Sequence, residues 1–313
     1  MRSVPERSYR VMRLAIIGDI HKAWDDADAA YFNASDYDAL LFVGDLPGRT
    51  HRGTLDVARG MSAVNKPALF LPGNHDGVSM MQLLAELQQN RSRIEKKSRG
   101  QEQLCAELDA ALGAIRMCGY SRHTLTSGST VIDVVAARPH SMGGDRLAYA
   151  PYLERTFGIG SMADSAARIL DCIRACENPI LILAHNGPTG LGGERNSIWG
   201  CDFRKEAGDF GDPDLRMALD QARVENCPVL GVVAGHMHLH VRGLPDRDWC
   251  VRQDNLTFVN AARVPRIFKL EGECVHHHIR MTIQAESVQV AEVLISDAGR
   301  VIRESAPAQP MNN

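Results

Sequence analysis

The chain has 313 residues, of which 44% are hydrophobic and 23% charged, the composition of an ordinary globular protein. Its formal net charge of -3 gives no general attraction to nucleic acid or to an anionic membrane, so any affinity for phosphate must come from a local site. No apolar run approaches the ~18 residues of a membrane span, and the N-terminal MRSVPERSYRV lacks the apolar stretch of a secretory signal. We therefore expect a soluble, cytoplasmic protein without a membrane partner. Its eight cysteines include no CxxC pair, which predicts reduced thiols.

Six apolar runs of strand length recur along the chain, separated by stretches typical of helices or loops. Because these runs are apolar on both faces, they predict a buried sheet with helices on either side, and hence an α/β fold. The runs are RLAIIG, ALLFVG, ALFL, VIDVVAA, PILILA and VLGVVAG.

Five of these runs are followed directly by side chains of the kinds that bind metals. In an open α/β sheet the ligand crevice lies at the carboxyl ends of the strands, so residues far apart in the sequence converge there. In an extended segment, residues two apart project from the same face, and both the first and the last run supply such a pair. The residues are Asp19 and His21, then Asp45, then Asn74, His75 and Asp76, then His185, and finally His236 and His238.

The ordered set GDIH, GD, GNHD, a lone His and GHMH resembles the calcineurin-like metallophosphoesterases, between residues 14 and 238. The resemblance implies a four-layer α/β/β/α sandwich with a dinuclear metal site at the carboxyl ends of the strands. Imidazole and oxygen ligands without thiolate suit Mn, Fe or Zn, and we expect Mn or Fe. By motif, Asp19, His21 and His238 would hold one metal, Asn74, His185 and His236 the other, and Asp45 would bridge the two.

The resemblance also implies the chemistry. Two metals would activate a bridging hydroxide for attack on a phosphomonoester or phosphodiester. His75, left unligated, could protonate the leaving group, while Asp76 could orient His75. One alternative is a nuclease, although an aromatic content of 5% and a negative net charge argue against it. The other is a non-catalytic metal-binding scaffold, against which the retention of every ligand argues.

Several further residues are candidates for substrate binding. Lys22 stands where family members commonly have Gly, and it either contacts the substrate or points outward. GDLPGRTHR replaces the GDxxDRG of protein phosphatases, which places that branch in doubt. Its Arg49, His51 and Arg52 either donate hydrogen bonds to the phosphate or form a solvated loop. Arg138 and His140, which follow VIDVVAA, would line the pocket if that run joins the sheet.

We expect one catalytic domain over residues 12–300, with disordered tails at 1–11 and 304–313. A helical, insertion-like segment around 88–118 is expected to form a surface helix, with a lid or a dimer arm as the alternatives. The triple His276, His277 and His278 opens an alternating pattern that predicts a β-hairpin about Glu286 and Ser287, and not a catalytic site. The sequence leaves the physiological substrate and the oligomeric state open.

Overall fold

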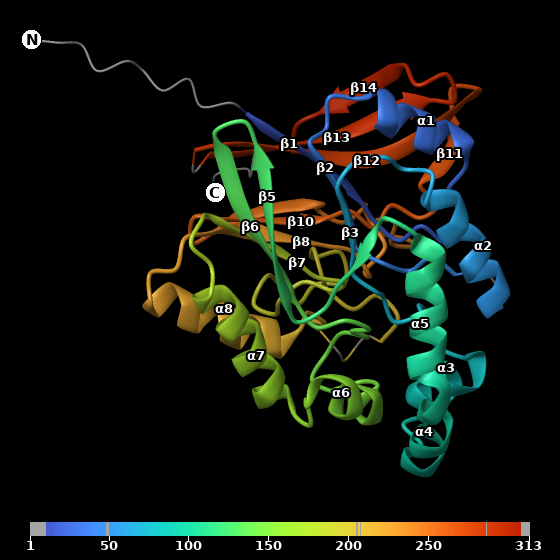
Figure 1. The fold of residues 1–313 in the computed structure, drawn as a ribbon, viewed down its shortest axis with the longest axis vertical. Helices are drawn as coiled ribbons and strands as arrows, with labels where there is room; N and C mark the ends of the chain where they lie inside the picture. The colour runs from blue at the N-terminus through green and yellow to red at the C-terminus, as the bar shows by residue number, and fades with distance from the viewer. Residues whose placement is uncertain (1–10, 48–49, 205, 207, 286, 308–313) are drawn as a thin grey trace, which may run out of the picture.

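The structure is a computed structural model of the chain, and it describes residues 11–47, 50–204, 206, 208–285 and 287–307. Two β-sheets pack face to face in the middle of the molecule, and helices cover the outer face of each sheet (Figure 1). This arrangement is the four-layer α/β/β/α sandwich, so the predicted fold class is confirmed.

The first sheet contains β1 (Met12–Ile17), β2 (Ala39–Phe42), β3 (Ala68–Phe70), β4 (Arg116–Met117), β11 (Ile267–Leu270), β12 (Glu273–Gln284), β13 (Ser287–Ser296) and β14 (Val301–Ser305). Its order is β14-β13-β12-β1-β2-β3-β4, and β11 also pairs with β12. Strands β1 to β4 are parallel, whereas β12 runs antiparallel to β1. The carboxyl ends of the parallel strands therefore meet at one end of the sheet.

The second sheet contains β5 (Ser121–Ser127), β6 (Thr130–Ala136), β7 (Ile180–Leu183), β8 (Val229–Ala234), β9 (Cys250–Gln253) and β10 (Leu256–Asn260). Its order is β5-β6-β7-β8-β10-β9, with β6, β7, β8 and β10 parallel and the two edge strands antiparallel. The six predicted apolar runs correspond to β1, β2, β3, β6, β7 and β8. Those runs are thus divided between two sheets.

The burial of both strand faces explains why these runs are apolar throughout. Leu14 and Ile16 of β1 lie in the core between the sheets, together with Leu181 and Val233 of the second sheet. Ile17 points the opposite way, into the core under the outer helices of the first sheet. Alternate side chains of one strand thus serve two different apolar layers.

The helices are α1 (Asp26–Ala34), α2 (His51–Met61), α3 (Met80–Leu87), α4 (Arg91–Lys97), α5 (Gln101–Leu112), α6 (Ala150–Phe157), α7 (Met162–Arg174) and α8 (Pro213–Val224), with a 3₁₀ turn at Ser98–Gly100. Helices α1, α2 and α5 contribute to the apolar core outside the first sheet. Helices α6, α7 and α8 contribute to the core outside the second. None of the helices in the described part of the chain is both long and apolar enough to cross a membrane.

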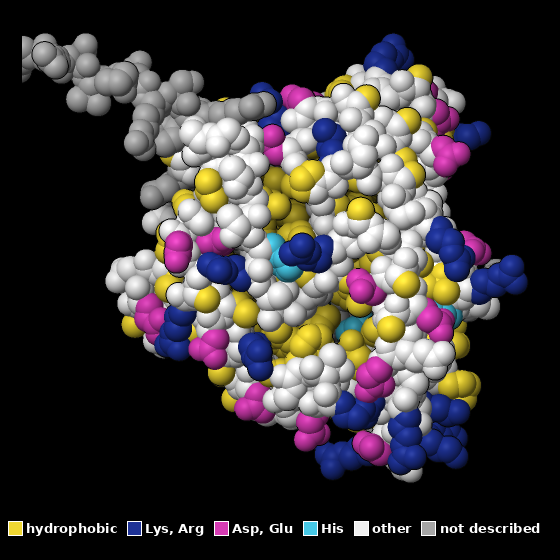
Figure 2. Space-filling model, in the orientation of Figure 1, with side chains coloured by type: hydrophobic (Ala, Val, Ile, Leu, Met, Phe, Trp, Pro, Cys, Tyr) yellow, Lys and Arg dark blue, Asp and Glu magenta, His cyan; other side chains and the backbone are white. Residues whose placement is uncertain are grey.

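The predicted helical segment around 88–118 consists of α4, the 3₁₀ turn and α5, and it ends in the short strand β4. Leu108 and Leu112 of α5 are completely buried in the core outside the first sheet. Lysine and arginine side chains gather over α4 at one tip of the molecule (Figure 2).

At the C-terminal side, Glu304 and Ser305 pair with β13 as the end of β14. The strand therefore extends into the range 304–313 that we predicted to be a disordered tail. Residues 1–10 and 308–313 lie outside the described residues.

The three consecutive histidines lie inside β12, which pairs with β13 as a hairpin. Of the two residues about which the turn was predicted, Ser287 begins β13 and Glu286 lies outside the described residues. His276 lies 3.1 Å from Asp28 and 2.8 Å from Asp297, and His277 lies 3.1 Å from Glu292. His278 lies 2.7 Å from the hydroxyl of Tyr37 and stays buried. Each ring thus has a polar partner outside the seven predicted metal ligands. All eight cysteines are free thiols, as predicted.

Candidate metal centre

The seven predicted metal ligands lie in five loops that meet at the carboxyl ends of β1, β2 and β3 of the first sheet and β7 and β8 of the second. The sequence analysis placed them along one strand edge. The structure instead places them where the ends of two packed sheets meet, so each sheet contributes part of the site.

One group of possible ligands consists of Asp19, His21 and His238. The Nε2 atom of His238 lies 3.5 Å from Asp19 Oδ2 and 3.3 Å from Nε2 of His21. Asp19 is completely buried, whereas both rings are partly accessible. This set is the one that motif resemblance assigned to the first metal.

A second group consists of Asp45, His185 and His236, with Asn74 beside it. Nε2 of His185 lies 3.0 Å from Asn74 Oδ1 and 3.2 Å from Nδ1 of His236. The other ring nitrogen of His185, Nδ1, lies 2.6 Å from the carbonyl oxygen of Val43. That contact fixes Nδ1 as the donor, so the lone pair of Nε2 faces the cluster, as a ligating histidine requires.

Asp45 lies between the two groups. Its Oδ2 atom is 3.9 Å from Nε2 of His21 in the first group and 3.7 Å from Nε2 of His185 in the second. Its other oxygen, Oδ1, accepts a hydrogen bond from the backbone N–H of His75 at 3.0 Å. The Oδ2 atom is therefore placed where one carboxylate could serve two cations.

Unusual backbone conformations concentrate at this site. Asp19, His21, Asp45 and His236 all have positive φ angles, of 30°, 39°, 54° and 69°. Non-glycine residues adopt this region at an energetic cost and mostly where the surroundings enforce it, often at functional sites. We predicted that extended backbone places Asp19 and His21 on the same face. That reason is wrong, because both residues have positive φ angles. Tight left-handed turns bring the two side chains together instead.

Two glycines of the motifs are required because ligand side chains from other loops approach them closely. A Cβ at Gly73 would lie 2.3 Å from Asp45 Oδ1 and 2.6 Å from Cε1 of His185. A Cβ at Gly235 would lie 2.2 Å from Asp19 Oδ1. The glycines of GNHD and GHMH thus leave room for ligand side chains from other loops.

The charges of the cluster suit a bound cation. Burial lowers the pKa of His21, and it lowers the pKa of His236 to about 3, so both rings are neutral and able to donate lone pairs near pH 7. Burial also opposes protonation of His185, but the negative charges of Asp45 and Asp19 outweigh it and raise the pKa of that ring. The carboxylates therefore favour a positive charge at this position.

The carboxylate of Asp19 provides a further test of whether the site fits a metal ion. Its Oδ1 atom accepts from the backbone N–H of His236 at 3.0 Å, whereas its buried Oδ2 atom has no hydrogen-bond partner. An unsatisfied carboxylate oxygen inside a protein is costly, and a metal ion would satisfy it. The donor set of carboxylate, imidazole and amide oxygen fits two divalent transition metals.

A family model for calcineurin-like phosphoesterases matches residues 12–240, a range that contains all seven of these residues. The chain belongs to this family. No curated protein sequence matches the chain.

Solved structures that resemble this chain share little sequence with it. The sulfate thiohydrolase SoxB of Thermus thermophilus is 11% identical, with a TM-score of 0.46, over 96% of this chain and 57% of that one. An archaeal phosphodiesterase is 10% identical, with a TM-score of 0.37, over 91% and 100% of the two chains. Vps29 of Chaetomium thermophilum is 11% identical, with a TM-score of 0.34, over 96% and 98%.

His75 lines the cavity over the ligand groups, but Asp76 does not. Asp76 is completely buried and accepts three backbone hydrogen bonds, from Asp45 N at 2.7 Å, Leu46 N at 2.9 Å and Gly73 N at 2.8 Å. The predicted role of Asp76 in orienting His75 is therefore wrong. Asp76 instead ties the loop after β3 to the loop that carries Asp45.

Replacing Asp76 by Asn should loosen this connection. An amide has only one acceptor oxygen, so its NH₂ group would face a backbone donor, and an unsatisfied buried donor costs about 1–3 kcal/mol. We expect D76N to lower the free energy of unfolding of the metal-free protein by that amount in urea denaturation. The control D171N removes a carboxylate that is 69% exposed and should change little. An unchanged stability in D76N would contradict the structural role.

Arg138 and His140, predicted to line the pocket, are both buried. Nε of Arg138 donates to Asp214 at 2.8 Å, and its Nη2 atom lies 3.0 Å from Asp212. His140 lies behind the GNHD loop, with Nδ1 3.1 Å from the carbonyl oxygen of Gly73, and burial lowers its pKa to about 4. Both predictions of substrate contact are wrong, because long-range partners hold these side chains inside the protein.

The remaining predicted substrate residues have different positions. Lys22 is exposed, and its backbone N–H donates to Leu46 O, but it does not line the cavity over the metal cluster. His51 and Arg52 begin α2 and are not in a solvated loop, and His51 lies 3.1 Å from Glu107. Arg49 lies outside the described residues.

The cavity over the cluster has a volume of about 260 Å³. Besides predicted site residues, it is lined by Asp202, Phe203, Met237 and His240, which were not predicted to be site residues. Asp202 and Phe203 belong to the long connection between β7 and α8 and match no motif, so no local pattern could have singled them out. His240 lies two residues beyond GHMH, and the repeated spacing of His236, His238 and His240 was the available signal.

Proposed function

We propose that this protein hydrolyses phosphoester bonds with two divalent transition metal ions held by seven residues. The observation that carries the proposal is the position of Asp45 Oδ2 between the Asp19, His21, His238 group and the His185, His236, Asn74 group. Two metal ions in such a site supply an activated water and neutralise the charge of the phosphate.

In this proposal each group of protein residues has its own task. The seven ligands would hold the two metal ions between the loops of the two sheets, where the phosphate would bind. His75, which lines the same cavity as Asn74 and His238, donates a proton to the departing alcohol oxygen. Water contributes the new oxygen on phosphorus, and the ester P–O bond breaks with its electron pair on the alcohol.

The alternative of a non-catalytic metal-binding scaffold is less well supported by the arrangement. A scaffold has no need of an unligated imidazole, yet His75 faces the cavity at the cluster. The alternative of a nuclease predicts a cationic groove at the metal site. The described residues that line the cavity over the ligand groups include no lysine or arginine.

The proposal is tested by metal analysis and substrate turnover together. We expect close to two Mn or Fe ions per chain after reconstitution, measured by elemental analysis. Hydrolysis of p-nitrophenyl phosphate or bis-p-nitrophenyl phosphate should rise in parallel with occupancy across added Mn, Fe, Zn and Mg. Saturation at one metal, or full occupancy without turnover of either ester, would contradict it.

A further inference from the structure

A second cavity adjoins the one over the metal cluster. It has a volume of about 320 Å³ and is also lined by Asn74, His236 and Phe203, so the two spaces share three residues. A substrate whose phosphate lies at the metal ligands can therefore extend one substituent past Phe203 into this second space. We call it the Phe203 cavity.

The walls of the Phe203 cavity are largely apolar. Leu87 of α3, Met142, Phe203 and Phe210 face it, and 60% of the Phe203 side chain is exposed. The rings of Phe203 and Phe210 meet edge to face, with centroids 5.1 Å apart. An exposed ring in this position offers an apolar face to a bound group, and aromatic faces favour planar groups.

Backbone next to Phe210 forms part of the wall of the cavity. Gly143 and Gly144 both have a φ of 72°, and a Cβ on Gly143 would lie 2.6 Å from the ring of Phe210. The backbone N–H of Gly144 donates to Phe210 O at 3.0 Å. The two glycines thus let the Phe210 ring lie against the chain and keep the cavity open.

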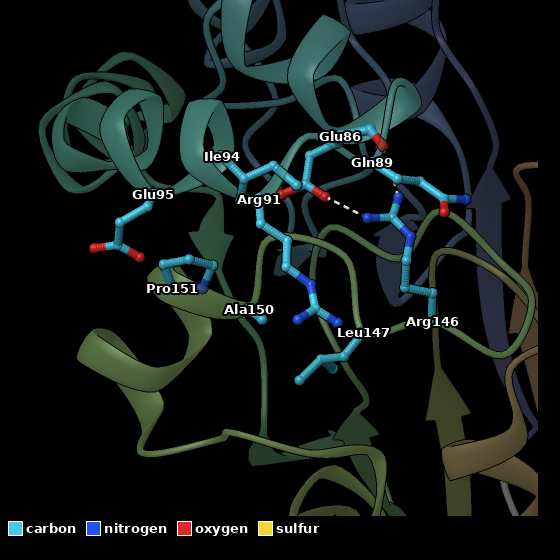
Figure 3. Close-up of a pocket in the computed structure, with 9 residues that line it drawn as sticks. All are labelled: Glu86, Gln89, Arg91, Ile94, Glu95, Arg146, Leu147, Ala150 and Pro151. Carbon is cyan, nitrogen blue, oxygen red and sulfur yellow. Dashed lines mark hydrogen bonds and ion pairs between the residues drawn. The ribbon is translucent and has the colours of Figure 1, made fainter.

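The charges around the Phe203 cavity balance. Arg146 is ion-paired with Glu86 at 2.8 Å, as the dashed line in Figure 3 shows, and it also donates to Glu86 O. Asp145 and Arg204 add one charge of each sign. A neutral group therefore fits this space better than an anionic one.

A third cavity, of about 250 Å³, shares His75 with the cavity over the ligand groups and shares no lining residue with the Phe203 cavity. Thr50, His51 and Ser79 are among its lining residues. Because His75 is proposed to protonate the leaving group, the departing alcohol belongs on this side. The cavity over the ligand groups thus adjoins two separate spaces, one at His75 and one at Phe203, and each can take one substituent.

We propose that the substrate is a phosphodiester whose retained alcohol carries a neutral, planar apolar group, such as an aryl ring or a nucleobase, held in the Phe203 cavity. This inference rests on the proposed phosphoester hydrolysis. In the reaction, water adds to phosphorus, the P–O bond on the His75 side breaks, and the leaving oxygen takes a proton. The retained group then remains as a phosphomonoester.

The first test varies only the retained group. Methyl p-nitrophenyl phosphate and phenyl p-nitrophenyl phosphate lose the same leaving group, so the ratio of their kcat/KM values reports the Phe203 cavity. We expect the phenyl ester to be favoured roughly tenfold, and F203A to bring the ratio towards one, since stacking on an aromatic side chain contributes that much. The control M217A removes an exposed side chain of α8 and should keep the ratio.

The second test measures binding without turnover. Phenylphosphonate and methylphosphonate, which have no hydrolysable ester bond, resemble the monoester products. Calorimetry of the metal-loaded protein should show at least fivefold tighter binding of phenylphosphonate, and F203A should remove the difference.

The outcomes separate this inference from the proposed function. Equal kcat/KM values for the two diesters, a preference that survives in F203A, or a preference for p-nitrophenyl phosphate over both diesters would overturn the inference alone. Turnover of none of the esters would overturn the proposed function. In that case the phosphonate affinities still decide whether the Phe203 cavity binds a planar group.

Discussion

D45N should lose metal and activity together. Asp45 Oδ2 lies within 4 Å of a nitrogen of each ligand group, and an asparagine there has no charge to share between two cations. Because removing a residue that only supports a ligand costs 10–100-fold in affinity or activity, we expect loss of a shared ligand to cost at least about 100-fold in kcat/KM. Elemental analysis and ester turnover on the same samples provide the measurement.

Asparagine is the appropriate replacement because Asp45 has a φ of 54°, which asparagine tolerates better than alanine does. Its amide oxygen can still accept the backbone N–H of His75. The control D109N changes an exposed carboxylate on α5. Full activity with two bound metals in D45N would show that Asp45 does not bridge them.

H75A should keep both metals and lose turnover. His75 lines the cavity over the cluster but belongs to neither ligand group, so its loss removes a proton donor and leaves the ligand sets intact. General acid catalysis contributes about 10²–10⁴-fold, and a good leaving group needs it less. We therefore expect a small loss for p-nitrophenyl esters and a loss of about 100-fold or more for phenyl and alkyl esters.

H75N provides the matched comparison, because asparagine can donate a hydrogen bond to phosphate but cannot act as an acid. If H75N behaves like H75A, proton transfer is the function that was lost. Equal losses for good and poor leaving groups, with recovery in H75N, would assign His75 to phosphate binding. Loss of metal in H75A would make His75 a ligand.

The sequence predicted the group of candidate metal ligands better than it predicted the residues around that group. The ligand residues follow strands directly, so their positions depend on short-range geometry and on the edge where strands end. Arg138 has the same relation to β6, yet its partners Asp212 and Asp214 lie about 75 residues further along the chain. No local pattern reveals that pairing. A buried ion pair and a substrate contact therefore look alike in the sequence.

Asp76 illustrates the same limit within a motif. A carboxylate beside a histidine can either orient the ring or accept hydrogen bonds from backbone N–H groups. Which of the two it does depends only on the path of the neighbouring loop. The loop containing Asp45 and Leu46 brings its N–H groups to Asp76. The Phe203 cavity could not be predicted from the sequence either. Its walls come from three distant segments, namely α3, the segment after β6 and the connection before α8.

Each of the two ligand groups draws on both sheets. In the first, Asp19 and His21 follow β1 and His238 follows β8; in the second, Asp45 and Asn74 come from the first sheet and His185 and His236 from the second. A metal ion in either position would therefore link the two sheets of the sandwich. The free energy of metal binding would then include the free energy of keeping the two sheets in their relative position. The same holds for any site whose binding free energy contributes to folding. A substitution in the apolar core between the sheets can consequently alter the spacing of the ligands without touching one of them.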